Sequence, residues 1–188
     1  MNYKESVIFT PRLELHHISA DRLINLFEKR EDTFALSGET FTNPLRVLID
    51  FQGPLAWRVP QVKEDDSVNK WFVRWIVLKD SLEVIGSTSF HGKPNAEGMM
   101  EIGLGIESEY QNQGYAKEAL LGMWRWALTF PEVKTLRYTV SPENLASIAV
   151  INYFGFNFMG QQMDDVDGPE DIYEMDRESF LQHWGSNQ

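Results

Sequence analysis

Residues 99–128 read MMEIGLGIESEYQNQGYAKEALLGMWRWAL, and the other elements of the chain are interpreted around them. Residues 99–106 are apolar enough for a buried strand, and the acids and amides of residues 107–113 end it. From Gly114 onward the apolar residues fall at three- and four-residue spacing, which predicts an amphipathic helix over residues 114–128. The expected inward stripe consists of Ala116, Leu120, Leu121, Trp124 and Leu128.

The loop before this helix has the composition of an anion site. Its residues are Gln111, Asn112, Gln113, Gly114, Tyr115 and Ala116. The first N–H groups of a helix lack partners and carry the positive end of the helix dipole, so they can bind phosphate without a basic side chain. Gly114 permits a positive φ angle and a close approach of the ligand. An ordinary tight turn is the alternative interpretation, and neither a three-glycine dinucleotide fingerprint nor a Walker lysine pattern is present.

Three motifs in order resemble one enzyme family. Gln111-x-x-Gly114-x-Ala116 after the strand EIGLGI resembles the acetyl-CoA loop of the GNAT N-acetyltransferases. The later run NLASIAVINYFGF, residues 144–156, is similar to that family's next helix and its Gly-Phe ending. TPRL near the start, residues 10–13, resembles the branch of ribosomal-protein-alanine/serine N-acetyltransferases, the RimJ/RimL-like proteins. The resemblance covers residues 9–175.

The resemblance implies a fold, a cofactor and a reaction. The fold is α/β: a mixed, mostly antiparallel central sheet of about seven strands, splayed at the central parallel pair and flanked by helices. We expect one GNAT acetyltransferase domain over residues 1–188. Acetyl-CoA would be the co-substrate, without a metal, and acetyl would pass directly to a primary amine in a ternary complex. The amine could belong to a small molecule, a peptide or a protein N-terminus.

Composition narrows the partners. The chain has 17 Lys and Arg residues and 28 Asp and Glu residues, which gives a net charge of −11. This charge disfavours binding to nucleic acid and anionic membrane and favours a cationic partner such as an amine. Solubility alone also explains such a charge. The absence of cysteine excludes disulfides and thiol catalysis and fits a reducing cytoplasm. The start MNYKESVIFTPRL lacks the apolar core of a signal peptide, and no apolar run is long enough to span a bilayer. A homodimer is compatible with the sequence.

The rest of the chain alternates strands and helices. Strands are expected over residues 13–17, 71–78, 82–90, 135–140, 156–159 and 171–175, and helices after Ser19, after Pro142 and over 177–184. The strand–helix–strand unit around residues 114–128 allows its two strands to lie parallel. In residues 31–66 the pattern is broken by Pro44, Pro54 and Pro60. The resemblance implies that this segment covers the acceptor site; its spacing alone indicates only an apolar connector.

Glu101 is the candidate catalytic base. It stands in an otherwise apolar strand, where burial would raise the pKa of its carboxyl group and let it take a proton from an ammonium through water. Pairing with a basic residue or a peptide N–H is the structural alternative. The family's Glu-Ile-Gly pattern is compatible with catalysis or with holding the substrate amine.

Two glycines in the same strand indicate a bulge or a close backbone approach. Gly103 and Gly105 are poor strand formers, and close packing alone could explain them. The resemblance implies that this strand's edge binds the thioester oxygen and pantetheine through the backbone of Leu104 and Ile106.

The helix after Pro142 carries the remaining cofactor candidates. The resemblance implies that Asn144 holds pantetheine and that Ser147 contacts the cofactor, although Asn144 alone is typical of a helix start. The family's general-acid tyrosine position is Ile151 here, so Ser147 or water would protonate the thiolate, unless no protein acid is needed. Tyr153 is a further cofactor-binding candidate. The departure at Ile151 also motivates an alternative function, a non-catalytic acyl-CoA-binding or sensing module.

The acceptor pocket and metal sites have weaker sequence signals. We expect Trp57, Trp75 and His91 to line the substrate pocket. The histidines show no ligand spacing, so no metal site is expected. The tryptophans lack interleaved basic residues and therefore do not indicate a nucleic-acid stacking platform.

Overall fold

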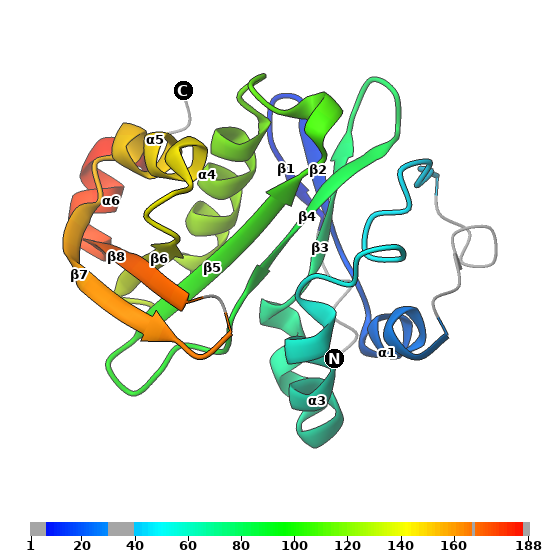
Figure 1. Ribbon diagram of the computed structural model, residues 1–188, viewed down its shortest axis with the longest axis horizontal. Coiled ribbons are helices and arrows are strands. Elements are labelled where there is room, and N and C mark those ends of the chain that lie inside the picture. Colours follow the sequence, from blue (N-terminus) through cyan, green and yellow to red (C-terminus); the bar gives the residue numbers. More distant parts are fainter. Residues whose placement is uncertain (1–6, 30–39, 167, 186–188) are drawn as a thin grey trace.

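A computed structural model describes residues 7–29, 40–166 and 168–185 and shows one eight-stranded sheet flanked by helices (Figure 1). The strand order is β1-β2-β3-β4-β5-β6-β8-β7. The strands are β1 (Ile8–Phe9), β2 (Leu13–His17), β3 (Arg74–Leu78), β4 (Val84–Phe90), β5 (Met99–Ile106), β6 (Thr135–Val140), β7 (Asn157–Asp164) and β8 (Gly168–Asp176). All neighbouring strands are antiparallel except β5 and β6, which are parallel. The expected mixed, mostly antiparallel sheet is confirmed.

The sequence analysis did not predict β1, and it predicted β7 and β8 to be shorter than they are. β1 has only two residues and lies at the sheet edge, too short for alternation to be visible. The last hairpin is longer than predicted because polar residues such as Gln161 and Gln162 continue β7 and pair with β8. Those side chains are exposed on an edge strand, so they look like loop residues in sequence.

The helices stand in two groups in Figure 1, α1 and α3 on the right and α4, α5 and α6 on the left. Their bounds are α1 (Ala20–Lys29), α3 (Leu55–Glu64), α4 (Tyr115–Ala127), α5 (Leu145–Phe154) and α6 (Arg177–Trp184), with short 3₁₀ turns η1 (Asp66–Trp71) and η2 (Ser108–Tyr110). Pro60 lies inside α3 and does not break it, contrary to the prediction. One missing N–H is tolerated because the buried face of α3 stays packed. The helix expected after Ser19 is confirmed as α1.

The buried face of α4 packs into an aromatic core. The Trp124 ring lies 4.9 Å from Phe154, 4.8 Å from Phe156 and 6.0 Å from Phe180, measured between ring centroids. Leu120, Trp124 and Leu128 are buried as predicted, whereas Ala116 and Leu121 are only half-buried. Ala119, Met123 and Ala127 complete the buried face instead, since the inward stripe is rotated slightly from the predicted one.

Candidate active site

The loop before α4 has the geometry of a phosphate cradle. Gly114 precedes the helix with φ of 83°, in the left-handed region where a Cβ atom is unfavourable. Gly114 has no side chain that could cap the first N–H groups of α4, and this helix start has no side-chain cap among the residues that the structure describes. These donors and the helix dipole therefore remain available to an anion, as predicted for a phosphate loop.

A salt bridge that the sequence did not reveal supports this loop. The Glu118 carboxylate accepts hydrogen bonds from the Thr10 hydroxyl at 2.6 Å, the Arg12 backbone N–H at 2.6 Å and the Arg12 Nε at 2.7 Å. Arg12 also donates from Nη1 to the Gln113 carbonyl at 3.0 Å. Arg12 therefore ties the start of the chain to both α4 and the loop, which is the structural role of the TPRL run.

Glu118→Gln should lower the melting temperature at neutral pH by a few degrees, because a carboxylate with charge-assisted bonds is replaced by a neutral amide. Burial raises the pKa of Glu118, but the hydrogen bonds and the charge of Arg12 outweigh burial and hold this pKa below its ordinary value. Its contribution to stability is therefore present above the unfolded-state pKa of about 4.3 and is lost as pH falls through the folded-state pKa. Thermal melts of both proteins against pH would contradict this account if the gap persisted under strongly acidic conditions.

A cleft of about 480 Å³ opens beside the loop, between the end of β5 and helices α4 and α5. Of the predicted cofactor residues, this cleft is lined by Leu104, Ile106, Gln111, Asn112, Gly114, Tyr115, Ala116, Asn144 and Ser147. Alanines from α4 and α5 also line it, which leaves room for a ligand between the helices.

Two predicted cofactor residues lie elsewhere. The side chain of Gln113 donates to the Glu109 carbonyl at 3.1 Å and does not line the cleft. Tyr153 lies on the face of α5 that is turned toward α6, with its ring 5.4 Å from that of Trp184 and 4.0 Å from the Lys117 Nζ atom. The structure therefore does not support the assignment of Tyr153 to the cofactor, since the helical phase at residue 153 directs this side chain away from the cleft.

The sheet is splayed where the cleft meets β5. Residues Met99 to Glu101 of β5 pair with Thr135 to Arg137 of β6, and pairing stops there. On its other side β5 stays paired with β4 as far as Ile106, without a register shift. The predicted glycine bulge is therefore absent. A Cβ atom on Gly103 would lie 3.1 Å from the His91 side chain at Nε2, whereas one on Gly105 would meet no atom within 4 Å.

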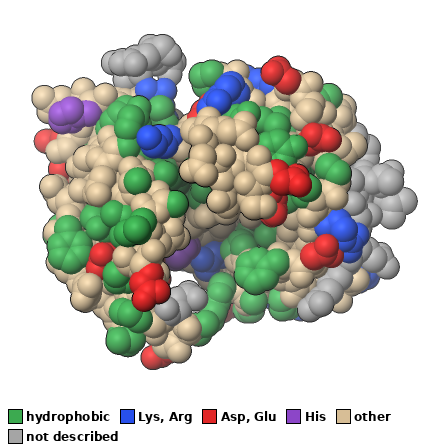
Figure 2. Space-filling model, turned by 45° about the horizontal axis from the view of Figure 1, so that its top comes forward, with side chains coloured by type: hydrophobic (Ala, Val, Ile, Leu, Met, Phe, Trp, Pro, Cys, Tyr) green, Lys and Arg blue, Asp and Glu red, His purple; other side chains and the backbone are tan. Residues whose placement is uncertain are grey.

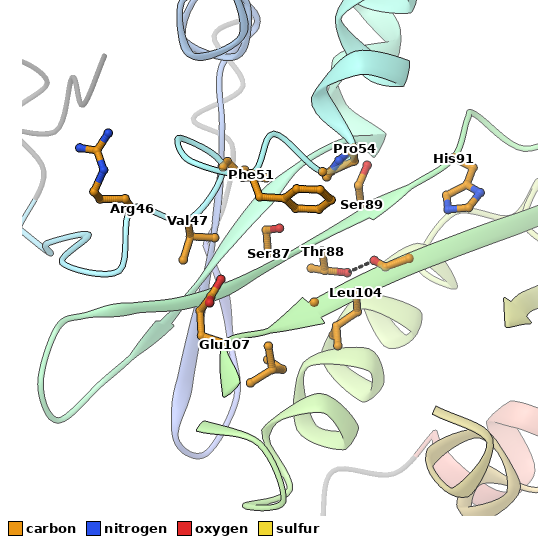
Figure 3. Close-up of a pocket in the computed structure, with 15 residues that line it drawn as sticks. Arg46, Val47, Phe51, Pro54, Ser87, Thr88, Ser89, His91, Leu104 and Glu107 are labelled. Carbon is orange, nitrogen blue, oxygen red and sulfur yellow. Dashed lines mark hydrogen bonds between the residues drawn. The ribbon is translucent and has the colours of Figure 1, made fainter. Parts of the chain in front are cut away.

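A second cavity lies on the other side of the same β5 segment (Figure 3). Its volume is about 320 Å³, and Leu104, Gly105 and Ile106 line both it and the cleft. Figure 3 shows Phe51 and Pro54 on one side of this cavity, facing the β4 residues Ser87 to Ser89. Residues before α3 therefore cover this cavity.

A third cavity, of about 530 Å³, continues from the second past Phe51, Pro54 and His91. It is lined further by Trp57, Arg58, Gln61, Glu101 and Thr139 and, from the last hairpin, by Gln162, Asp164 and Glu170. Figure 2 shows a hollow with histidine and Lys or Arg side chains inside it and acidic side chains on its rim. We call the second and third cavities together the acceptor cavity.

Glu101 lies in this acceptor cavity with two hydrogen-bonding neighbours. His91 Nδ1 lies 3.2 Å from its Oε1 atom, and the Thr139 hydroxyl donates to the same oxygen at 2.5 Å. Burial raises the pKa of Glu101, but the hydrogen bond and charge of His91, the Thr139 hydroxyl and the charge of Arg137 together hold this pKa below its ordinary value. The predicted raised pKa is therefore wrong, because partners on β6 and just after β4 stabilise the carboxylate.

Thr139→Val should raise the pKa of Glu101, because the hydroxyl that stabilises the ionised form is removed while the side-chain shape is kept. If ionised Glu101 is required for turnover, the acidic limb of the kcat/KM profile moves to higher pH. The profile of each protein, measured from pH 4 to 8, tests this; an unmoved limb would show that another group controls it.

The cofactor side of β6 carries a tyrosine that the sequence did not single out. Tyr138 is buried and lines the cleft together with Ser147. Burial raises the pKa of Tyr138, and the Ser147 side chain partly opposes this rise. Asn144 starts α5 by accepting the Ser147 N–H at 3.0 Å, so it has the helix-start role and also lines the cleft.

Of the predicted pocket residues, Trp57 and His91 line the acceptor cavity and Trp75 does not. The Trp75 side chain is fully buried. β3 is paired on both edges and its side chains are covered on both faces, so alternation could not decide which face meets the pocket.

Two other findings concern the part of the chain that the structure describes. Residues 7–29, 40–166 and 168–185 contain no group of three or more metal-ligating His, Cys, Asp or Glu side chains. Over the same ranges, every helix is too short or too polar to cross a membrane.

Comparisons with known proteins agree with this geometry. A family model described as "Acetyltransferase (GNAT) domain" matches residues 12–157. The ribosomal-protein-S5-alanine acetyltransferase of Vibrio fischeri shares the fold with a TM-score of 0.64, at 17% identity, over 92% of this chain and 97% of that one. RimL, a ribosomal-protein N-acetyltransferase solved in complex with coenzyme A, has a TM-score of 0.63 at 14% identity, over 93% of this chain and 99% of that one.

A curated relative matches part of the chain. YjdG of Bacillus subtilis (strain 168), an uncharacterized N-acetyltransferase, is 34% identical over 88 residues, which are 46% of this chain and 52% of that protein. The match thus spans about half the length of this relative. The family model covers most of the chain, and the chain belongs to the GNAT acetyltransferase family.

Proposed function

We propose that this protein transfers acetyl from acetyl-CoA directly to a primary amine in a ternary complex. One observation carries the proposal: residues Leu104 to Ile106 of β5 form a common wall between the cleft and the acceptor cavity. A donor in the cleft and an acceptor in the cavity would meet at the edge of this segment, where β5 has no β6 partner, so transfer would need no covalent enzyme intermediate.

The cleft residues fit acetyl-CoA. The N–H groups at the start of α4 would bind the pyrophosphate, with the charge of Arg12 nearby. Beyond Glu101, β5 has no β6 partner, so its backbone can pair with an extended amide chain such as pantetheine. Acetyl-CoA supplies the acetyl thioester, and RimL was solved with coenzyme A.

His91 and Glu101 would receive the amine. A neutral His91 that donates from Nδ1 to Glu101 keeps an acceptor lone pair on Nε2. Glu101 stays ionised at neutral pH, attracts the ammonium group and stabilises the imidazolium form of His91 when the amine proton moves to it. The amine nitrogen then attacks the thioester carbonyl carbon, the C–S bond breaks, and the nitrogen loses its second proton to solvent to give the neutral amide.

Tyr138 and Ser147 would serve the leaving thiolate. The ordinary pKa of tyrosine already keeps Tyr138 protonated at neutral pH and burial raises this pKa further, so its hydroxyl group can donate a hydrogen bond or a proton to the sulfur. This proposal extends the sequence-based one, in which Ser147 or water had this role. Ile151, at the family's tyrosine position, is fully buried and cannot take part.

An initial-rate assay of coenzyme A release tests the function. Purified protein with acetyl-CoA should release coenzyme A only when an amine is present, and mass spectrometry should show an acetylated amine. The panel should include peptides that begin with serine or alanine, since neighbours in the comparison acetylate ribosomal proteins, as well as amino acids and polyamines. Acetyl-CoA binding without transfer to any amine would favour the non-catalytic acyl-CoA-binding module.

A further inference from the structure

The acceptor cavity contains a buried arginine that the proposed reaction does not use. Arg58, on α3, is 6% exposed and lines the same 530 Å³ cavity as Glu101 and His91. Its guanidinium carbon lies 5.7 Å from the centroid of the Phe72 ring. A cation in this position faces the space that the acceptor amine would occupy.

No side chain or backbone carbonyl among the described residues accepts a hydrogen bond from the Arg58 guanidinium. Its Nε atom is fully buried without an acceptor. Leaving a buried guanidinium without acceptors is costly, and such groups normally pair with an anion. Burial lowers the pKa of Arg58 to about 10, and the opposing charge of Glu101 does not restore it. The guanidinium therefore has unused donors beside the cavity.

Other arginines in the described part of the chain do have carboxylate partners. Arg12 pairs with Glu118 at 2.7 Å, Arg46 with Asp50 at 2.8 Å and Arg137 with Glu174 at 2.5 Å. These three are all more exposed than Arg58. The least solvated of the four is therefore the one without a carboxylate partner, which is the reverse of what stability alone would favour.

The cavity thus has opposite charges on its two sides. β5 and the turn after β4 contribute Glu101 and His91, which suit an amine, and α3 contributes Arg58, which suits an anion. A planar guanidinium binds a carboxylate through two parallel hydrogen bonds and so fixes its orientation. We propose that Arg58 binds a carboxylate of the acceptor, so that the acceptor is a small amine that also carries a carboxylate, of which an α-amino acid is the simplest.

This inference rests on the proposed function and narrows its substrate class. It predicts that polyamines, and peptides without an acidic group near the amine, are poor acetyl acceptors. A peptide with an acidic side chain at its second residue has the same chemistry, so the experiment must separate it from a free amino acid. The alternative is that Arg58 acts only on Glu101 through its charge, and then a carboxylate on the acceptor would bring no gain.

The test compares the twenty L-amino acids with their amides, and both with peptide amides whose second residue is aspartate or alanine. Coenzyme A release gives kcat/KM for each with the wild type, Arg58→Gln and Arg58→Lys. The wild type should prefer an amino acid over its amide by about tenfold or more. Arg58→Gln should abolish that preference through a rise in KM for the acid relative to its amide, and Arg58→Lys should keep part of it. The amine of an amino acid and that of its amide differ in basicity. Comparing the acid-to-amide ratio of kcat/KM between wild type and variant removes this difference.

An equal acid-to-amide ratio in wild type and Arg58→Gln would overturn the inference while leaving acetyl transfer intact. Preference for the aspartyl peptide amides over both amino acids and alanyl peptides would also overturn the free amino acid as the acceptor. If no amine is acetylated, the proposed function fails, and a binding measurement then tests whether Arg58 binds a carboxylate. Calorimetry on the coenzyme A complex should then show N-acetylamino acids binding about tenfold more tightly than their amides, and only with Arg58 present; equal affinities would refute the site.

Discussion

Glu101→Gln should reduce kcat by about 100-fold while changing the affinity for acetyl-CoA by less than about twofold. The carboxylate accepts from His91 and Thr139 and stabilises positive charge on the imidazole, and a neutral amide of the same shape cannot do so. The residue lines the acceptor cavity and not the cofactor cleft, so binding of acetyl-CoA is spared. Steady-state coenzyme A release and calorimetric titration with acetyl-CoA measure the two effects.

Glu97→Gln is the matched control, because it removes the same charge from an exposed position in the turn before β5. It should leave both quantities unchanged. Wild-type turnover in Glu101→Gln would remove Glu101 from the mechanism, and a large loss of acetyl-CoA affinity would mean that the substitution disturbs the fold of β5.

Gly114→Glu should weaken acetyl-CoA binding by more than about 100-fold. The new carboxylate would stand at the start of α4, where it repels the phosphates and competes for the same N–H groups. A side chain at φ of 83° also strains the loop. Isothermal titration with acetyl-CoA measures this loss directly.

Gly168→Glu is the control for Gly114→Glu. It shows whether the loss of affinity depends on the position of Gly114 or only on the added charge and backbone strain. Gly168 has φ of 81°, and a Cβ atom there would meet no other atom within 4 Å. The substitution adds the same charge and the same backbone strain in the β7–β8 hairpin, away from the cleft. It should keep wild-type affinity for acetyl-CoA; a similar loss in both variants would show that the cradle is elsewhere.

Local patterns predicted the elements around the cleft well. The bounds of β5 and β6 agree with the sequence analysis, and α4 differs from it by one residue at each end, because strand length, Gly114 and helical spacing are local properties. Most of the predicted loop residues line the cleft for the same reason. Gln113 and Tyr153 were misplaced because the direction of a single side chain depends on its neighbours, here Glu109 and Trp184.

The properties of the acceptor cavity depend on contacts between residues that are distant in sequence. The low pKa of Glu101 arises from His91 on the turn after β4 and from Thr139 and Arg137 on β6. Trp75 alternates like a pocket residue but is covered on both faces of β3. Arg58 has no motif at all: its position is visible only once α3 lies over the sheet. Sequence spacing contains none of this information.

Binding of acetyl-CoA is the central claim, and the melting temperature with and without it tests the claim most directly, with a nicotinamide adenine dinucleotide as control. A ligand at a hundred times its dissociation constant stabilises a protein by about 2.7 kcal/mol, which for a chain of 188 residues raises the melting temperature by several degrees. We predict this rise with acetyl-CoA and none with the dinucleotide. No rise at millimolar acetyl-CoA, or an equal rise with both ligands, would contradict the assignment of the cleft.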